Sequence, residues 1–189
     1  MDSTATLEVS SSGRLTAMTE INLNGGTLLM SGSGSQRIND GAGEAPLRLL
    51  SGGKLALNGP IITESFGTLT VTGGGIIDFG TGSGQLTFSD SSALTWSGLL
   101  SLWNWDGATD HITFGSSAAS LTPEQLASVR FYSDSGTTSL GSGVIQSDGS
   151  VVPVPEASAL VTPAILLLSI CSRRRRTSPA GRVAPGLTV

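Results

Sequence analysis

The sequence of 189 residues contains one cysteine, one histidine and few charged side chains. Cys171 has no second thiol in the chain, which excludes an intramolecular disulfide. A single histidine, His111, excludes a metal centre built from several imidazoles and disfavours a Ser-His-Asp triad. Charged residues make up only 13% of the chain, and Lys and Glu, which favour helices, are scarce. We therefore expect short strands joined by tight turns.

The few charges are unevenly distributed. Residues 1–150 contain 5 basic and 13 acidic side chains, a formal charge of −8, whereas the other five basic residues lie within 173–182. A body this acidic repels phosphates, so nucleic acid is not an expected partner. The first ten residues, MDSTATLEVS, lack the basic and apolar regions of a secretory signal. If the protein is exported, its signal has to lie upstream of this chain.

Glycine pairs punctuate the first part of the chain. They occur at 25–26, 52–53 and 73–74, each between two strand-like segments, as in NLNGGTLL. Glycine suits such corners because it reaches positive φ without strain. About three strands per unit of 20–27 residues indicate an all-β fold: a right-handed parallel β-solenoid (β-helix) over residues 1–115, with Leu and Ile pointing inward. An antiparallel sandwich is the competing architecture.

Residues 116–151 follow a different sequence pattern from residues 1–115 and predict a cap on the solenoid. A short helix is expected over 123–128, with Thr122 as its N-cap, Pro123 in the first position and Glu124 in the first turn. Three apolar side chains are expected to pack against the core: Leu121, Leu126 and Val129. Two strands, VRFYS and GVIQSDGSVV, then follow as a closing hairpin.

The search for catalytic or metal-binding residues yields weak candidates. The segment GTGSG at 80–84 predicts a turn, because it lacks the spacing and the Lys-Ser/Thr ending of a phosphate-binding loop. Asp106, Asp110 and Asn104 offer oxygen ligands for calcium, but without a recognised calcium-loop spacing. His111 is interpreted as a strand residue on a solvated face. We expect no catalytic residues, metal or cofactor.

The three tryptophans, Trp96, Trp103 and Trp105, are the best candidates for ligand contact. Trp103 and Trp105 are two residues apart and would share one face of a strand, a geometry that stacks sugar rings where the rings are exposed. Buried aromatic rings at the end of a solenoid core are the alternative. A carbohydrate-binding module is therefore the second function that the sequence supports.

The end of the chain combines an apolar run with a cluster of arginines. Residues 157–172 carry no charge and as a helix would extend about 24 Å, less than the roughly 30 Å core of a bilayer. Cys171 is interpreted as an apolar side chain of this transmembrane-type helix, with a lipidated thiol as the alternative. Clustered arginines stay on the cytoplasmic side, which would place the acidic body outside the cytoplasm. The four arginines that give this topological signal are consecutive: Arg173, Arg174, Arg175 and Arg176.

The order of Pro-Glu, short apolar helix and terminal Arg cluster resembles the PEP-CTERM sorting signal of Gram-negative bacteria. The body segments FSDSSALTW, NWDG, ITFGSSAASLTPEQLASVRFYSD and GSVVPVPE strengthen the resemblance over residues 85–176, which is to the β-repeat, autotransporter-passenger-like members. The resemblance implies that Pro155, Glu156 and Ala157 form the sorting motif, with Ala157 where a second proline is usual. It also implies processing by an exosortase, a membrane protease/transpeptidase, after a transient stay in the inner membrane.

The sequence therefore predicts an exported, non-catalytic structural or adhesive protein of the cell surface or extracellular matrix. Residues 152–176 would be its sorting signal and 177–189 a disordered tail. The expected partners are the processing enzyme, the inner membrane and exopolysaccharide. An ordinary tail anchor without processing is the alternative for the tail. A polysaccharide lyase is disfavoured, because such a site needs several charged side chains converging on one face.

Overall fold

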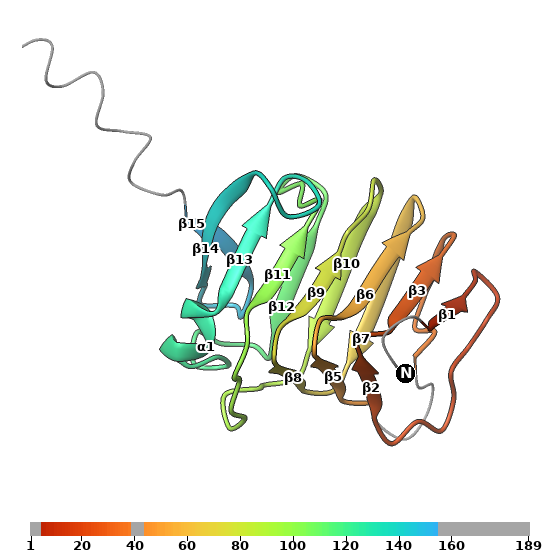
Figure 1. The fold of residues 1–189 in the computed structure, drawn as a ribbon, viewed down its shortest axis with the longest axis horizontal. Coiled ribbons are helices and arrows are strands. Elements are labelled where there is room, and N and C mark those ends of the chain that lie inside the picture. The colour runs from red at the N-terminus through yellow and green to blue at the C-terminus, as the bar shows by residue number, and fades with distance from the viewer. Residues whose placement is uncertain (1–4, 39–43, 155–189) are drawn as a thin grey trace, which may run out of the picture. The chain divides into compact units, whose positions relative to one another are not determined.

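The computed structural model describes residues 5–38 and 44–154, which form a β-solenoid of about five turns with one short helix (Figure 1). The long sheet contains β1 (Thr6–Val9), β3 (Thr27–Ser31), β6 (Gly53–Asn58), β9 (Gly75–Asp78), β11 (Leu100–Trp103), β13 (Val129–Tyr132), β14 (Ser139–Ile145) and β15 (Val151–Val154). The four-stranded sheet contains β4 (Gly34–Ser35), β7 (Ile61–Phe66), β10 (Ser83–Phe88) and β12 (His111–Phe114). The three-stranded sheet contains β2 (Ile21–Asn24), β5 (Leu47–Leu50) and β8 (Leu69–Thr72).

Successive turns of the chain stack in parallel register. Along the long sheet Thr27 lies opposite Lys54, Lys54 opposite Ile76, Ile76 opposite Ser101, and Ser101 opposite Arg130. Because Thr6 lies opposite Thr27, the turns are 21, 27, 22, 25 and 29 residues long. The predicted parallel β-solenoid is confirmed, and the antiparallel sandwich is wrong. Only the last turn is longer than expected, because it includes the helix of the cap.

The predicted glycine corners are confirmed. Gly25, Gly52 and Gly73 have φ values of 69°, 81° and 69°, in the left-handed region that side chains disfavour. The second glycine of a pair matters for a different reason. A Cβ on Gly53 would lie 1.9 Å from the carbonyl oxygen of Leu23, so only glycine lets these two turns approach closely.

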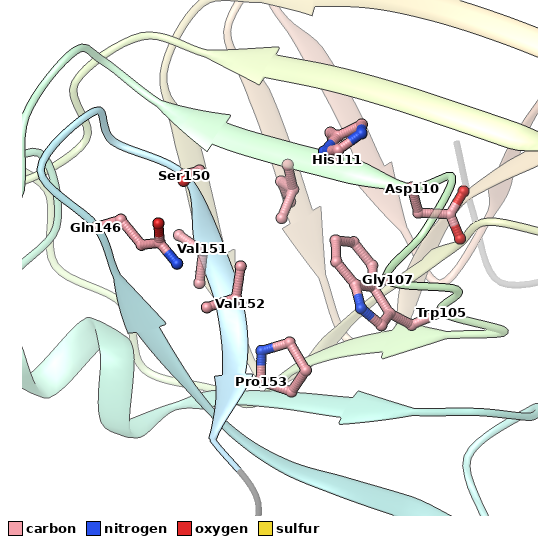
Figure 2. Close-up of a pocket in the computed structure, with 10 residues that line it drawn as sticks. Trp105, Gly107, Asp110, His111, Gln146, Ser150, Val151, Val152 and Pro153 are labelled. Atoms are coloured by element: carbon pink, nitrogen blue, oxygen red, sulfur yellow. The ribbon is translucent and has the colours of Figure 1, made fainter.

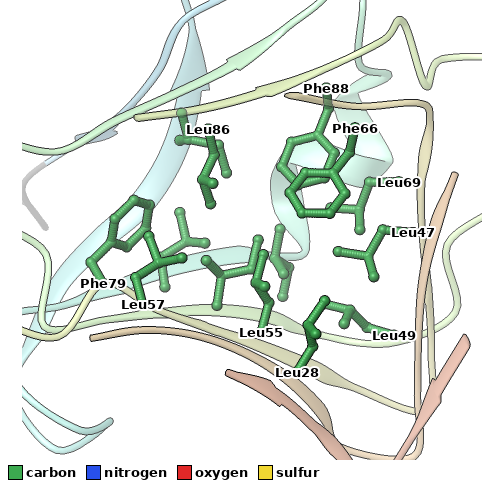
Figure 3. Close-up of a cluster of buried hydrophobic side chains, with 14 of the residues drawn as sticks. Leu28, Leu47, Leu49, Leu55, Leu57, Phe66, Leu69, Phe79, Leu86 and Phe88 are labelled. Atoms are coloured by element: carbon green, nitrogen blue, oxygen red, sulfur yellow. The ribbon is translucent and has the colours of Figure 1, made fainter. Parts of the chain in front are cut away.

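The interior is filled by alternate residues of the strands, as the apolar alternation predicts. Leu28, Leu55, Ile77 and Leu102 occupy paired positions of the long sheet and are all fully buried. Leucine and phenylalanine side chains from the other two sheets meet them in the middle (Figure 3). Three phenylalanines of the four-stranded sheet, Phe66, Phe88 and Phe114, stack ring on ring at the same register position.

The cap is formed by α1 (Pro123–Ala127) and three strands that end the long sheet. Thr122 caps the helix and Pro123 opens it, as predicted. Gln125 completes a capping box with Thr122, and its amide also donates to the carbonyls of Ser91 and Leu94 at 2.8 Å. Strand β14 runs antiparallel to both β13 and β15. An antiparallel closure is therefore present as expected, but GVIQSDGSVV is not one strand, because a turn divides it between β14 and β15. The expected packing is also present: Leu121 and Val129 are buried and Leu126 packs against the core.

The predictions for the end of the chain fall on residues outside the described ranges, and they stay predictions. They concern the apolar run 157–172 with Cys171 and the tail 177–189. They also concern the sorting motif and the cytoplasmic stop, which are Pro155, Glu156 and Ala157, and Arg173, Arg174, Arg175 and Arg176. Among residues 5–38 and 44–154, helices of the length and apolarity needed to span a membrane are not found.

Candidate functional site

The geometry expected for the tryptophans is wrong in one respect. Strand β11 ends at Trp103, and Asn104 then adopts a φ of 54°, which turns the chain at a corner of the solenoid. Trp105 consequently enters the core, where it is 6% exposed and meets Phe79 and Phe131 edge to face, with ring centroids 5.1 Å and 4.8 Å apart. The two indoles therefore do not form a shared sugar platform.

Trp103 and Trp96 are only half-buried, and other groups already contact their rings. The Lys54 ammonium lies 5.2 Å from the centroid of the Trp103 ring, and Gly136 packs against the nitrogen side of the same ring. The Trp96 Nε1–H group donates to the Leu69 carbonyl at 2.9 Å. These rings brace the turns of the solenoid.

Asp78 organises the polar cluster beside Trp103. The Lys54 Nζ atom lies 2.6 Å from its Oδ2, and the Asn104 amide donates to its Oδ1 at 2.7 Å. Burial acts to raise the pKa of Asp78, but hydrogen bonds from Lys54, Asn104 and the Gly80 N–H outweigh it and hold this pKa below its usual value. The folded state therefore favours the ionised carboxylate.

Replacing Asp78 by Asn should cost about 1 kcal/mol at neutral pH, as expected for a partly exposed ion pair. A depressed folded-state pKa gives stability that is present above the unfolded pKa of about 3.9 and is lost as pH falls through the folded value. The difference in unfolding free energy between wild type and Asp78→Asn should thus shrink below about pH 4. Urea titrations from pH 7 to 2 measure it, and a constant difference would contradict the ionic role.

Of the candidate calcium ligands, Asp106 and Asp110 lie side by side, whereas Asn104 is turned to Asp78. The two carboxylate oxygens of Asp110 accept from the N–H groups of Gly84 and Asp106 at 2.9 Å and 2.8 Å. One oxygen of Asp106 accepts from Ala108 N–H, and the Asn104 amide turns to Asp78. Burial is the main cause that raises the pKa of Asp110. These hydrogen bonds shape a turn.

A pocket of about 370 Å³ opens beside this turn, between β12 and β15. Its apolar lining includes Trp105, Ile112 and Pro153, and its polar lining includes Asp110, His111, Gln146 and Ser150 (Figure 2). His111 opens β12 and is exposed, as predicted. Sequence reasoning missed Gln146, Ser150 and Pro153, which stand next to the pocket only because the cap hairpin folds back onto β12.

A buried ion pair was also missed. Arg37 is 2% exposed and Glu64 is fully buried, with the Arg37 Nε atom 2.8 Å from Glu64 Oε1. The alternation of β7 indicates that Glu64 is buried, because it lies in phase with the inward-facing Ile62 and Phe66.

Within the part of the chain that the structure describes, groups of three or more His, Cys, Asp or Glu side chains placed to hold a metal ion are not found. Comparison of the chain with protein-family models, with curated proteins and with solved structures finds no match.

Proposed function

We propose that the protein is an exported, non-catalytic structural or adhesive component of the cell surface or extracellular matrix, sorted by its C-terminal segment. The observation that carries the proposal is the position of the tail pattern relative to the fold. The last strand of the described residues, β15, ends at Val154, and the Pro155–Glu156 motif follows at the next residue. The cap thus closes the described core before the motif begins. A segment that a separate enzyme recognises has to lie outside the folded core in this way.

The body fits a scaffold role. Its core is continuous from β1 to β15, and parallel stacking makes each turn support the next, as in other solenoids. We propose the right-handed coil that parallel crossovers almost always adopt. The apolar run at 157–172 is proposed as the transient membrane helix and Arg173–Arg176 as its cytoplasmic stop.

Replacing Glu156 by Ala should leave uncut precursor in the inner membrane of an exosortase-containing host, when the full chain is expressed behind an export signal. A carboxylate resists entering the bilayer, and the prolines before it disfavour helix, so charge and extended backbone coincide at this point. The mass of the recovered protein measures processing.

The matched control is Glu124→Ala, which removes an exposed glutamate from the cap and should leave processing unchanged.

Replacing Arg173, Arg174, Arg175 and Arg176 with neutral residues should expose the tail to protease in spheroplasts that protect the wild-type tail. Wild-type protein that keeps its arginines and its last 13 residues would show that the segment is only an anchor.

A further inference from the structure

The pocket beside the cap exists because two strands start to pair and then part. Thr113 of β12 bridges to Ser150 in antiparallel sense, and the Phe114 N–H donates to the Gly149 carbonyl at 2.9 Å. Alternate residues of β15 direct their N–H groups toward β12, and the position that should continue this ladder is Pro153, which has no N–H. The gap is therefore encoded by a single proline at a strand edge.

The floor of the pocket holds a polar atom without a partner. Trp105 is 6% exposed, and its Nε1–H group has no acceptor among the described residues. Figure 2 shows the nitrogen on the side of the indole that is turned toward β15. A buried N–H left unpaired costs about 1–3 kcal/mol. The Nε1 atom itself is covered by protein, so the indole offers the pocket an apolar surface and not a hydrogen bond.

The rim supplies the complementary groups. The Asp110 carboxylate is buried and accepts from two backbone N–H groups, so it shapes the rim and supplies negative charge near the pocket. The Gln146 amide both donates and accepts, and Ser150 carries a hydroxyl. Among the residues that line the pocket, Asp110 is the acid and His111 is the only group able to become a cation. The site therefore suits a neutral ligand better than an anion.

We propose that this pocket binds one neutral sugar unit, with the apolar face of the ring against Trp105, Ile112 and Pro153. A sugar hydroxyl is both donor and acceptor, so hydroxyls of the ring can pair with the Gln146 amide and donate to the Ser150 hydroxyl oxygen. A volume of about 370 Å³ lies at the small end of ligand pockets, which suits about one or two sugar rings. An extended peptide fits less well, because Pro153 removes a donor that strand addition needs.

The proposal rests on the proposed function only for the source of the sugar, an exopolysaccharide. Soluble sugars test the pocket without the tail, and the mass of the processed protein tests the tail without the pocket. The two proposals can therefore fail separately.

The test titrates the protein with glucose, galactose, N-acetylglucosamine, cellobiose and diacetylchitobiose up to about 20 mM, followed by saturation-transfer NMR and Trp fluorescence. Gln146→Ala should weaken binding of the best sugar about 3- to 10-fold through the loss of one hydrogen bond. Trp105→Phe keeps an apolar ring beside the pocket and removes the unpaired N–H, so binding should stay within about 3-fold of the wild type while thermal stability stays equal or rises.

Gln36→Ala, at a glutamine whose amide donates to Ser65 in a distant turn, is the matched control and should bind like the wild type. Glucuronic acid should bind more weakly than glucose because of Asp110. Failure of all five neutral sugars to bind would overturn the proposal. So would equal binding by wild type and Gln146→Ala, a comparison that holds even if Trp105→Phe does not fold.

Discussion

Replacing Arg37 by Met should destabilise the protein by about 3–5 kcal/mol, because it leaves the Glu64 carboxylate buried without its cation. Glu64 is fully buried and accepts from Arg37 twice, at Oε1 from Nε at 2.8 Å and at Oε2 from the backbone N–H at 2.7 Å. The guanidinium also donates through Nη1 to the carbonyls of Ser31 at 2.8 Å and Val9 at 3.2 Å. One side chain thus joins three successive turns.

Urea unfolding of the single and double variants measures the effect. Arg37→Met combined with Glu64→Gln removes both charges and keeps an amide oxygen for the residue 37 N–H. We expect the double variant to be about 2 kcal/mol more stable than Arg37→Met alone, because breaking a buried pair costs more than replacing both partners. Additive losses in the two single variants would contradict this account.

The surface pair Arg48–Glu20 is the matched control. Its atoms approach to 3.1 Å, but the side chains are 44% and 36% exposed. Arg48→Met should therefore cost about 0–1 kcal/mol. A similar loss at both arginines would show that burial is not the deciding factor.

Sequence reasoning predicted the coil and the cap because both depend on local chemistry. Glycine pairs at 25–26, 52–53 and 73–74 marked corners through backbone freedom, and Thr122 with Pro123 marked the start of a helix through capping. The alignment of one turn on the next does not depend on local chemistry. Turn lengths vary between 21 and 29 residues, so the pairing of residues across turns cannot be read from a fixed period.

The candidate site shows the same limit. Trp103 and Trp105 would share one face if the strand continued through both residues. Asn104, between them, adopts a left-handed conformation and ends the strand. A proline disfavours helix, but Pro153 here acts on β15, whose neighbour Ser150 bridges to Thr113 of β12, 37 residues earlier in the chain. Long-range pairing of this kind decides where a pocket forms, and neighbouring residues do not reveal it.

The stack of three phenylalanines supplies the last prediction: Phe88→Ala should destabilise the protein by about 3–5 kcal/mol. The Phe88 ring is fully buried, with the Phe66 centroid at 5.3 Å and the Phe114 centroid at 5.1 Å, each at an interplanar angle of 16°. Its removal leaves a cavity in the middle of the column and breaks two aromatic contacts, each worth about 0.5–1.5 kcal/mol beyond burial.

Two comparison variants separate the causes in urea unfolding. Phe88→Leu refills most of the volume and should cost about 1–2 kcal/mol, the part that belongs to stacking. Thr87→Ala changes the exposed neighbour on the same strand and should cost less than about 1 kcal/mol. Phe88 belongs to a central turn, so its loss weakens the interfaces with the turns on both sides. The unfolding transition of Phe88→Ala should therefore have a lower urea midpoint and be less cooperative. A cost below about 1 kcal/mol for Phe88→Ala would mean that the turns hold together through their backbone ladders and not through this column of rings.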